Sequence, residues 1–452
     1  MMNRFFRWMS VGVLLVWTLP VWGQQVEPSV SQIVGIDAAR QRLGDRTPTG
    51  RGIVFGHVEG ETGHYSPRLG DPAFKGVNFI LRSGDSKPFG HTQATCKVIY
   101  GPHGLAPGVD TVHLFTTPHW LGAGHLRLLQ PFAPVMSPIR IFTHSWVAPE
   151  HPNGPQILRR IDYQIDQQEL IVCVGVNNGR QSQVPQLLGS AYNVIAVGTN
   201  DANGASSGGY TLGEQPGRCK PDIVGPRGLT SFTTPAVAAC AARLLEAADQ
   251  MPAMIQHAQR SEVIKAVLLA GAVKPWGWRR DKDKPLDEHR GAGVVHFDNS
   301  LRILQAGSTP PGAIGHDMGW SFHALSAGKH ATYTFAVGQL QRPLSVMLVW
   351  NRHVAGQTQP ARPGHPRVWD GPATLADFDL AISGLDDQGK ARLIQISRSR
   401  IDNVEHVYLP QLPPGRYRLD VVRQRDGHRG MWDYALAWRR GGVLDPEGPS
   451  GH

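Results

Sequence analysis

The hydrophobic pattern divides the chain into two parts. Up to about residue 245, short apolar runs alternate with helix-like stretches, and the runs lie at residues 52–58, 111–117, 139–147, 169–176 and 193–199. Continuous apolar strands separated by helices are typical of a parallel sheet that is buried on both faces. Ligands of such sheets bind at the carboxyl ends of the strands, so we look for site residues there.

The pattern changes after a stretch rich in Gly and Pro, AGSTPPGAIG, which begins at Ala306. Beyond it, apolar and polar residues alternate in short segments at 330–337, 344–350, 377–383, 392–397, 406–412, 416–422 and 434–438. Several alternating strands of this kind form a β-sandwich. A stretch rich in Pro, Gly and Arg at 353–373 is predicted to be a surface loop.

These patterns predict an order of segments. We expect a signal peptide over 1–23, a mostly parallel α/β domain over 24–305, a linker over 306–327, an all-β, jelly-roll-like sandwich over 328–440 and a flexible tail over 441–452.

The first residues indicate export. Arg4 and Arg7 precede an apolar stretch that is too short to span a bilayer, and Val21 and Gly23 have the size required before a cleavage site. We expect the mature chain to begin near Gln24 and to be secreted or periplasmic, without stable membrane insertion. The alternative is an uncleaved anchor.

Charge and cysteine content exclude several classes of protein. The net charge is +9, but the basic residues are scattered and no recognition motif accompanies them, so no nucleic-acid partner is expected. The four cysteines are too few for a disulfide scaffold, and no CxxC pair suggests zinc. We expect that most of the cysteines are buried thiols. Whether two of them form a disulfide is left open by the sequence. No cofactor is expected to be required.

A candidate nucleophile lies in GLTSFTTPAVAACAARLLEA, residues 228–247. Ser231 comes between a turn and an alanine-rich helix, where backbone amides favour developing negative charge. Such a serine also serves as a plain helix cap. His91 begins another short helix, and a histidine is the side chain that titrates near neutrality and can activate a serine. A buried strand ends in VGVNNG, and a side-chain amide there suits an oxyanion.

In this order the segments resemble the subtilisin-like serine peptidases, the subtilases. TSFTTPAVA resembles the serine motif of the family, HTQATCKVIYG the histidine motif and VGVNNG the oxyanion segment, while NVIAVGTND and KPDIVGP resemble linking segments. The resemblance covers residues 48–305. It implies that Ser231 is the nucleophile, that His91 is the general base and that Asn177 is the oxyanion donor, with Asn178 as the fallback.

The resemblance also suggests where a substrate binds. IFTHSWV resembles the strand of the family that pairs with a peptide backbone, which gives Ser145 and Trp146 a substrate-binding role. A buried aromatic without a substrate role is the alternative for Trp146.

The third triad member departs from the family. GRGIVFGHVEG aligns Glu59 with the usual Asp, and a longer carboxylate can still orient an imidazole. Glu61 and Asp71 are the rivals. His57 lies two residues before Glu59 and so on the same strand face, where it can disturb or tune the site. No inhibitory propeptide is recognised between Gln24 and Gly50.

The second part resembles the β-sandwich appended to some bacterial subtilases, on the segments LSVMLVW, LADFDLAISG and DNVEHVYLPQLPPGRYRLDVV. Asp377, Asp379 and Glu405 are candidate oxygen ligands for a structural calcium, although alternating acids also mark a solvated strand face. We assign no metal to the site itself.

These observations predict an exported serine endopeptidase that hydrolyses protein or peptide substrates through a Ser/His/acid triad and an acyl-enzyme. Two alternatives stay open. One is a catalytically weak relative that binds peptides, and the other is a serine esterase that uses the same triad.

Overall fold

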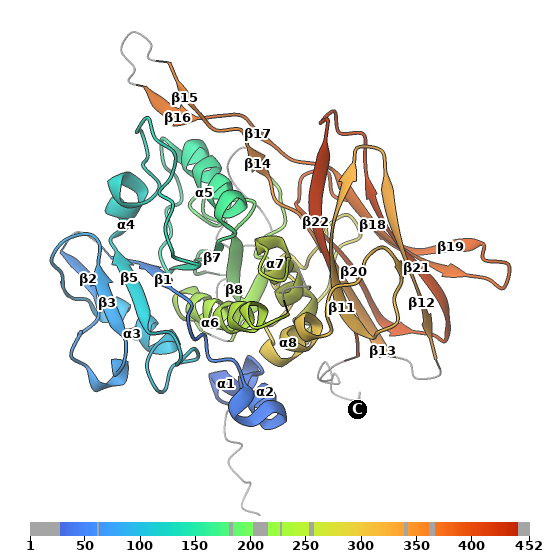
Figure 1. Ribbon diagram of the computed structural model, residues 1–452, viewed down its shortest axis with the longest axis horizontal. Coiled ribbons are helices and arrows are strands. Elements are labelled where there is room, and N and C mark those ends of the chain that lie inside the picture. The colour runs from blue at the N-terminus through green and yellow to red at the C-terminus, as the bar shows by residue number, and fades with distance from the viewer. Residues whose placement is uncertain are drawn as a thin grey trace, which may run out of the picture.

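The computed structural model describes residues 28–60, 63–179, 184–201, 216–226, 228–252, 257–338, 342–360 and 367–441. Within these residues an α/β part precedes a part built mostly of antiparallel sheets (Figure 1). The predicted fold class, an α/β domain followed by an all-β sandwich, is confirmed. The predicted signal peptide lies outside the described residues, as does the predicted tail beyond Gly441.

A parallel sheet forms the centre of the α/β part, and the described residues give it seven strands in the order β3-β5-β1-β6-β7-β8-β9. The strands are β1 (Phe55–Val58), β3 (Asn78–Leu81), β5 (Thr111–Phe115), β6 (Ile141–His144), β7 (Ile171–Gly175), β8 (Ile195–Thr199) and β9 (Ile223–Gly225). β2 (His64–Ser66) and β4 (Lys87–Pro88) form a separate pair. Because β1 lies between β5 and β6, the winding of the chain reverses beside it, and such a switch point is where a ligand crevice forms.

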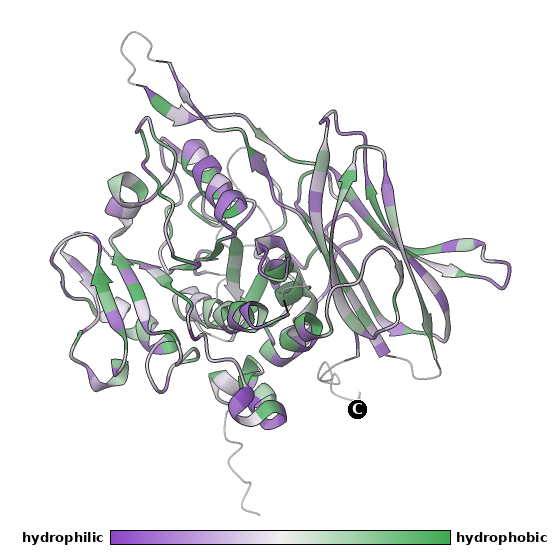
Figure 2. Ribbon diagram, viewed as in Figure 1, coloured by the Kyte–Doolittle hydropathy of each residue, from purple (hydrophilic) through white to green (hydrophobic). Residues whose placement is uncertain are grey.

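Helices cover both faces of this sheet. On β7, Ile171 and Cys173 pack in one core with α6 (Thr230–Asp249), whereas Val172 and Val174 pack in another with α5 (Gly154–Gln168). This two-sided burial explains why the strands are apolar without alternation. Figure 2 shows hydrophobic residues gathered in the sheet and in α6.

The remaining helices complete the α/β part. They are α1 (Val30–Ile33), α2 (Ile36–Leu43), η1 (Gly44–Arg46), η2 (Pro72–Phe74), α3 (Gly90–Ile99), α4 (Thr117–His119), η3 (Trp120–Gly124), α7 (Ser261–Gly271) and α8 (Phe297–Gln305). None of the helices that the structure describes is long and apolar enough to cross a membrane. All four cysteines lie within the described residues and are free, buried thiols, so the disulfide that the sequence left open is not formed.

The second part is a sandwich of two sheets. One has the order β10-β12-β21-β18-β19 and the other β11-β22-β13-β20. The strands are β10 (Gly312–Ala313), β11 (Met318–Ser326), β12 (His330–Val337), β13 (Arg342–Val349), β18 (Phe378–Leu385), β19 (Ala391–Ser397), β20 (Val404–Leu412), β21 (Gly415–Arg423) and β22 (Met431–Arg440). β11 pairs with β22, β12 with β21, β13 with β20 and β18 with β19, like a long hairpin rolled into two sheets. This nesting is the jelly-roll arrangement that was predicted.

Half of the stretch that was predicted to be a linker, 306–327, forms strands. The stretch contains β10 and β11, and β11 pairs with β22 along its whole length. The stretch AGSTPPGAIG ends at Gly315, and β11 begins three residues later. Trp320 of β11 is fully buried, and its indole Nε1 donates to the carbonyl oxygen of Leu304 at 3.1 Å.

The sandwich shares a hydrophobic core with the α/β part. On β13, Val346 and Leu348 face the inside of the sandwich, whereas Met347 and Val349 belong to the core that contains α7 and α8. The four-stranded sheet is therefore buried on both faces. The boundary predicted at residue 305 stays a prediction for the folding of the α/β part alone, because apolar contacts cross it.

The predicted surface loop after Trp350 is a β-ribbon that reaches over α5 (Figure 1). It consists of β14 (His353–Val354) paired with β17 (Ala373–Thr374) and β15 (Gln357–Gln359) paired with β16 (Val368–Asp370). Trp369 is buried, and its carbonyl oxygen accepts a hydrogen bond from Arg160 of α5 at 2.6 Å. The ribbon therefore fastens the sandwich to the helix that covers one face of the sheet.

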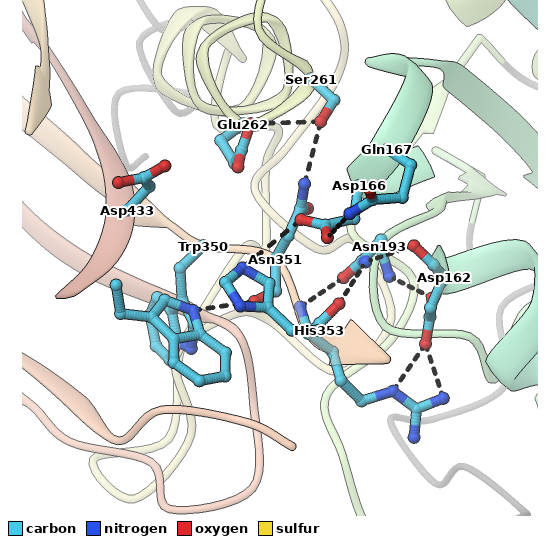
Figure 3. Close-up of polar contacts among 12 residues, drawn as sticks. Asp162, Asp166, Gln167, Asn193, Ser261, Glu262, Trp350, Asn351, His353 and Asp433 are labelled. Carbon is cyan, nitrogen blue, oxygen red and sulfur yellow. Dashed lines mark hydrogen bonds and ion pairs between the residues drawn. The ribbon is translucent and has the colours of Figure 1, made fainter. Parts of the chain in front are cut away.

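Buried polar contacts join the two parts where the ribbon begins (Figure 3). The side-chain amide of Asn351 donates to the hydroxyl of Ser261 at 3.0 Å. Arg352 donates to Asp162 of α5 at 2.7 Å, and its backbone amide donates to Asn193 at 2.8 Å. A buried pair of this kind is costly to break from one side, so these contacts fix the position of the sandwich.

We expect replacement of Trp320 by Ala to lower the free energy of unfolding by about 3–5 kcal/mol, because it opens a cavity in the shared core. The matched control is Trp276→Ala, since Trp276 is 76% exposed, and its effect should stay within about 0.5 kcal/mol. Urea unfolding of both variants measures the difference. Equal effects would show that Trp320 lies in a linker, as the sequence pattern indicated.

Candidate active site

The candidate residues gather at the carboxyl edge of the parallel sheet. Glu59 follows β1, Ser145 follows β6 and Asn177 lies just beyond β7. Helix α3 brings His91 and helix α6 brings Ser231 to the same edge. Segments that are far apart in the sequence thus converge beside the switch point of the sheet.

Glu59 and His91 are in direct contact. Oε2 of Glu59 lies 2.7 Å from Nδ1 of His91, the distance of a strong, charge-assisted hydrogen bond. The carboxylate is 1% exposed, whereas the imidazole is 35% exposed. The carboxylate of Glu59 is therefore enclosed, whereas the imidazole of His91 that it contacts is open to solvent.

The rival acids do not occupy this position. Asp71 caps η2, and its carboxylate accepts a hydrogen bond from Gln93 at 2.7 Å and pairs with Lys97 at 3.4 Å. Its carboxylate therefore binds side chains of α3 other than His91. Glu61 lies outside the described residues. Of the three candidate acids, Glu59 is the one that contacts His91 within the described residues.

Ser231 lies in the first turn of α6. The turn before it contains Gly228, whose φ of +118° favours glycine. Ser145 donates from its hydroxyl to the backbone oxygen of Ser231 at 3.0 Å, and the ring centroid of Phe232 lies 6.3 Å from that of His91. Ser231 is half-buried at the end of the helix that carries partial positive charge.

No hydrogen bond joins His91 and Ser231, both of which are among the described residues. In hydrolases this contact is often long until substrate binds, so the geometry is compatible with a nucleophile and its base. The roles of both residues stay predictions.

The two asparagines differ in how they are held. Oδ1 of Asn178 accepts from the backbone N–H of Thr230 at 3.0 Å and from its hydroxyl at 3.1 Å. Asn178, the fallback oxyanion donor, is thereby fixed to the start of α6. Asn177 is the less exposed of the two and lies closer to the end of β7. The choice of Asn177 stays a prediction.

The predicted substrate strand continues past β6. Ser145 contacts the backbone of Ser231, and the indole Nε1 of Trp146 donates to Nδ1 of His144 at 3.1 Å. Beyond them, Ala148 exchanges backbone hydrogen bonds with Leu187. Trp146 is only half-buried, so its ring is partly available for contact.

The three candidate calcium ligands lie within the described residues. Glu405 is fully buried and accepts hydrogen bonds from Ser397 and Ser399, and burial raises its pKa well above the ordinary value. Within the described ranges no group of three or more His, Cys, Asp or Glu side chains is arranged to hold a metal ion. A calcium bound by Asp377, Asp379 and Glu405 stays a prediction.

No protein-family model matches the chain, and no curated protein sequence matches it. Solved structures do match. The serine protease of Aeromonas sobria is 11% identical with a TM-score of 0.37, and the match covers 86% of this chain and 88% of that one. Fervidolysin from Fervidobacterium pennivorans, a keratinolytic enzyme related to subtilisin, is 13% identical with a TM-score of 0.40, covering 86% and 63%. MycP1 is 17% identical with a TM-score of 0.35, covering 59% and 96%.

The fold that the structure establishes is an α/β domain with a parallel sheet, followed by a β-sandwich. The chemistry that the site supports follows from its own side chains.

The electrostatics of the site centre on Glu59. Burial by itself raises the pKa of Glu59, but hydrogen bonds from His57 and His91 outweigh it and lower the pKa to about 2. The hydrogen bond between His91 and Glu59 raises the pKa of His91 above its ordinary value of 6.5, and partial burial of the imidazole opposes this shift only in part. Near neutral pH the carboxylate of Glu59 is therefore ionised, and it favours the protonated form of His91.

Sequence reasoning missed Tyr100 and Thr95, which both contact His57. Thr95 is one helical turn after His91, so helical spacing pointed to it. Tyr100 follows the last residue of α3, and no motif marked it. The sequence did place His57 on the face of Glu59, and Nε2 of His57 lies 3.2 Å from Oε1 of Glu59.

We expect the imidazole of His91 to titrate in NMR with a midpoint above pH 6.5, because the carboxylate of Glu59 stabilises the imidazolium and the proton leaves only at higher pH. In Glu59→Gln the midpoint should fall towards 6.5, since an amide cannot stabilise the cation. Asp71→Asn is the control and should leave the midpoint unchanged. A Glu59→Gln midpoint equal to that of the wild type would contradict this account of the pair.

Proposed function

We propose that the protein is an exported serine endopeptidase, in which Ser231 is the nucleophile and His91 the general base. The observation that carries the proposal is the hydrogen bond between the buried carboxylate of Glu59 and the partly exposed imidazole of His91. Ser231 lies beside this pair at the N-terminus of α6. An ionised acid, a base oriented by it and a nearby hydroxyl are the parts that acyl transfer requires.

The chemistry proceeds in two halves. His91 accepts the proton of the Ser231 hydroxyl through Nε2 while the oxygen bonds to the carbonyl carbon of a peptide. Asn177 and the first turn of α6 stabilise the oxyanion. The carbon–nitrogen bond then breaks, and His91 passes its proton to the leaving amine. Water, deprotonated by His91, hydrolyses the acyl-enzyme and restores the serine.

Substrate binding involves the extended segment after β6. We propose that a peptide pairs in β fashion with residues 145–147, which brings its carbonyl carbon to Ser231. The contact from Ser145 to the backbone of Ser231 supports this, because it keeps the strand and the nucleophile in fixed register. Protein or peptide chains are thus the proposed substrates.

Export belongs to the same proposal and depends on the sequence of residues 1–23 alone, which lie outside the described residues. Cleavage before Gln24 would deliver the chain to the periplasm or the medium. Intact mass spectrometry of the exported protein tests this, and retention of Met1 would contradict it.

We expect a fluorophosphonate probe to label the wild type and a peptide library to be cleaved by it, whereas Ser231→Ala should lose both activities because no other oxygen is activated there. Ser326→Ala, in the sandwich, is the matched control and should behave like the wild type. Equal labelling of Ser231→Ala and wild type would reject Ser231 as the nucleophile.

The substrates separate the remaining alternatives. Turnover of small esters without cleavage of any peptide would replace the endopeptidase by an esterase. Binding of peptides with neither labelling nor turnover would replace it by a peptide-binding relative.

A further inference from the structure

His57 is a buried polar residue in the central strand of the sheet. It belongs to β1, between β5 and β6, and is 1% exposed. Side chains alternate along a strand, so His57 points to the same face as Glu59, towards α3. An imidazole at such a place is stable only if its nitrogens form hydrogen bonds.

Both ring nitrogens of His57 have partners. Nε2 lies 3.2 Å from Oε1 of Glu59 and 3.1 Å from the hydroxyl of Thr95, while Nδ1 lies 3.2 Å from the hydroxyl of Tyr100. The Thr95 hydroxyl lies 3.1 Å from the backbone oxygen of His91 and donates its one proton to a backbone oxygen of its own helix, so it accepts from His57.

Glu59 determines which nitrogen donates. Its ionised carboxylate only accepts hydrogen bonds, so Nε2 of His57 donates to it. In the neutral imidazole the other nitrogen, Nδ1, then accepts from the hydroxyl of Tyr100. A continuous chain of hydrogen bonds results, from Tyr100 through His57 and Glu59 to His91.

The two oxygens of Glu59 are thus divided between two histidines. Oε1 faces His57 and Oε2 faces His91. A glutamate side chain has one more rotatable bond than an aspartate, so its carboxylate has more ways to turn away from the base. A second donor that holds Oε1 removes this freedom.

We propose that His57, held at its other ring nitrogen by Tyr100, is a positioning residue of the active site that holds one oxygen of Glu59 so that the other orients His91. The inference rests on the proposed peptidase function. It assigns no contact with substrate to His57, which acts through Glu59 alone.

Removal of the donor at His57 leaves Oε1 buried without its partner. The carboxylate then turns towards other donors, and its hydrogen bond to His91 weakens. We expect kcat of His57→Leu to fall by about 10- to 100-fold, the cost of a small misplacement within a catalytic group, while KM changes by less than about twofold because substrate contacts are intact.

The fall of kcat/KM at low pH distinguishes a positioning role of His57 from a merely structural one. Since the hydrogen bond from Glu59 raises the pKa of His91 above 6.5, a weaker bond should move the midpoint of kcat/KM down towards pH 6.5. The titratable side chains around His57 are Glu59 on its own strand, Cys96 and Tyr100 from α3 and its end, and His144 on β6. None of these is changed in His57→Leu.

The experiment compares four variants. His57→Gln keeps an N–H donor and should retain more activity than His57→Leu. Tyr100→Phe removes one oxygen and should shift the midpoint in the same direction, which tests the chain of hydrogen bonds even if His57→Leu fails to fold. The control is Tyr333→Phe, another buried tyrosine whose hydroxyl is hydrogen-bonded, in the sandwich, and it should change neither kcat nor the midpoint.

The outcomes are distinct. A midpoint that stays in place or rises in the folded His57→Leu and Tyr100→Phe variants overturns the inference, as does an equal loss of kcat in Tyr333→Phe. NMR titration of His91 reads the same shift without turnover, so an unshifted titration overturns the inference by itself. Absence of both turnover and labelling in the wild type instead overturns the proposed function.

Discussion

The buried carboxylate of Glu59 is the constraint on which the site depends. A charge that is 1% exposed is stable only where hydrogen bonds replace its water, and two imidazoles provide them. One of these imidazoles, His91, extends to the surface near Ser231. The other, His57, lies within the sheet and is held by α3. The carboxylate of Glu59 therefore links a histidine inside the sheet, His57, to a partly exposed histidine, His91.

The remainder of the fold keeps this arrangement rigid. Helix α6 carries Ser231 and packs in the core that continues through α7 and α8 to Trp320 and Met347 of the sandwich. The β-ribbon fastens the sandwich to α5 on the other face of the sheet. The sandwich thus supports the helices around the site from both sides, and its loss would expose apolar surface that the α/β part does not cover by itself.

Much of the fold could be predicted from the sequence, and the failures have physical causes. Strands β1, β5, β6, β7 and β8 of the parallel sheet and the helix that carries Ser231 were predicted, because continuous apolar runs and an alanine-rich stretch are local signals, whereas β3 and β9 were not predicted. The strands within the predicted linker were missed because Gly and Pro mark a turn but do not tell how soon the next strand begins. The ribbon was missed because Trp369 is buried against α5, which is remote in sequence. Tyr100 was missed because a contact between a helix end and the sheet leaves no local pattern.

The value of kcat for Glu59→Gln tests the central claim most directly. Glutamine keeps the size of the side chain and removes its charge, so the imidazole of His91 loses the group that fixes its tautomer and stabilises its cation. The account predicts a folded variant whose kcat falls about ten-thousandfold, the usual cost of losing the triad carboxylate, while Asp71→Asn keeps the wild-type value. A folded Glu59→Gln with kcat within about threefold of the wild type would contradict it, since a threefold change is only about 0.6 kcal/mol of transition-state stabilisation.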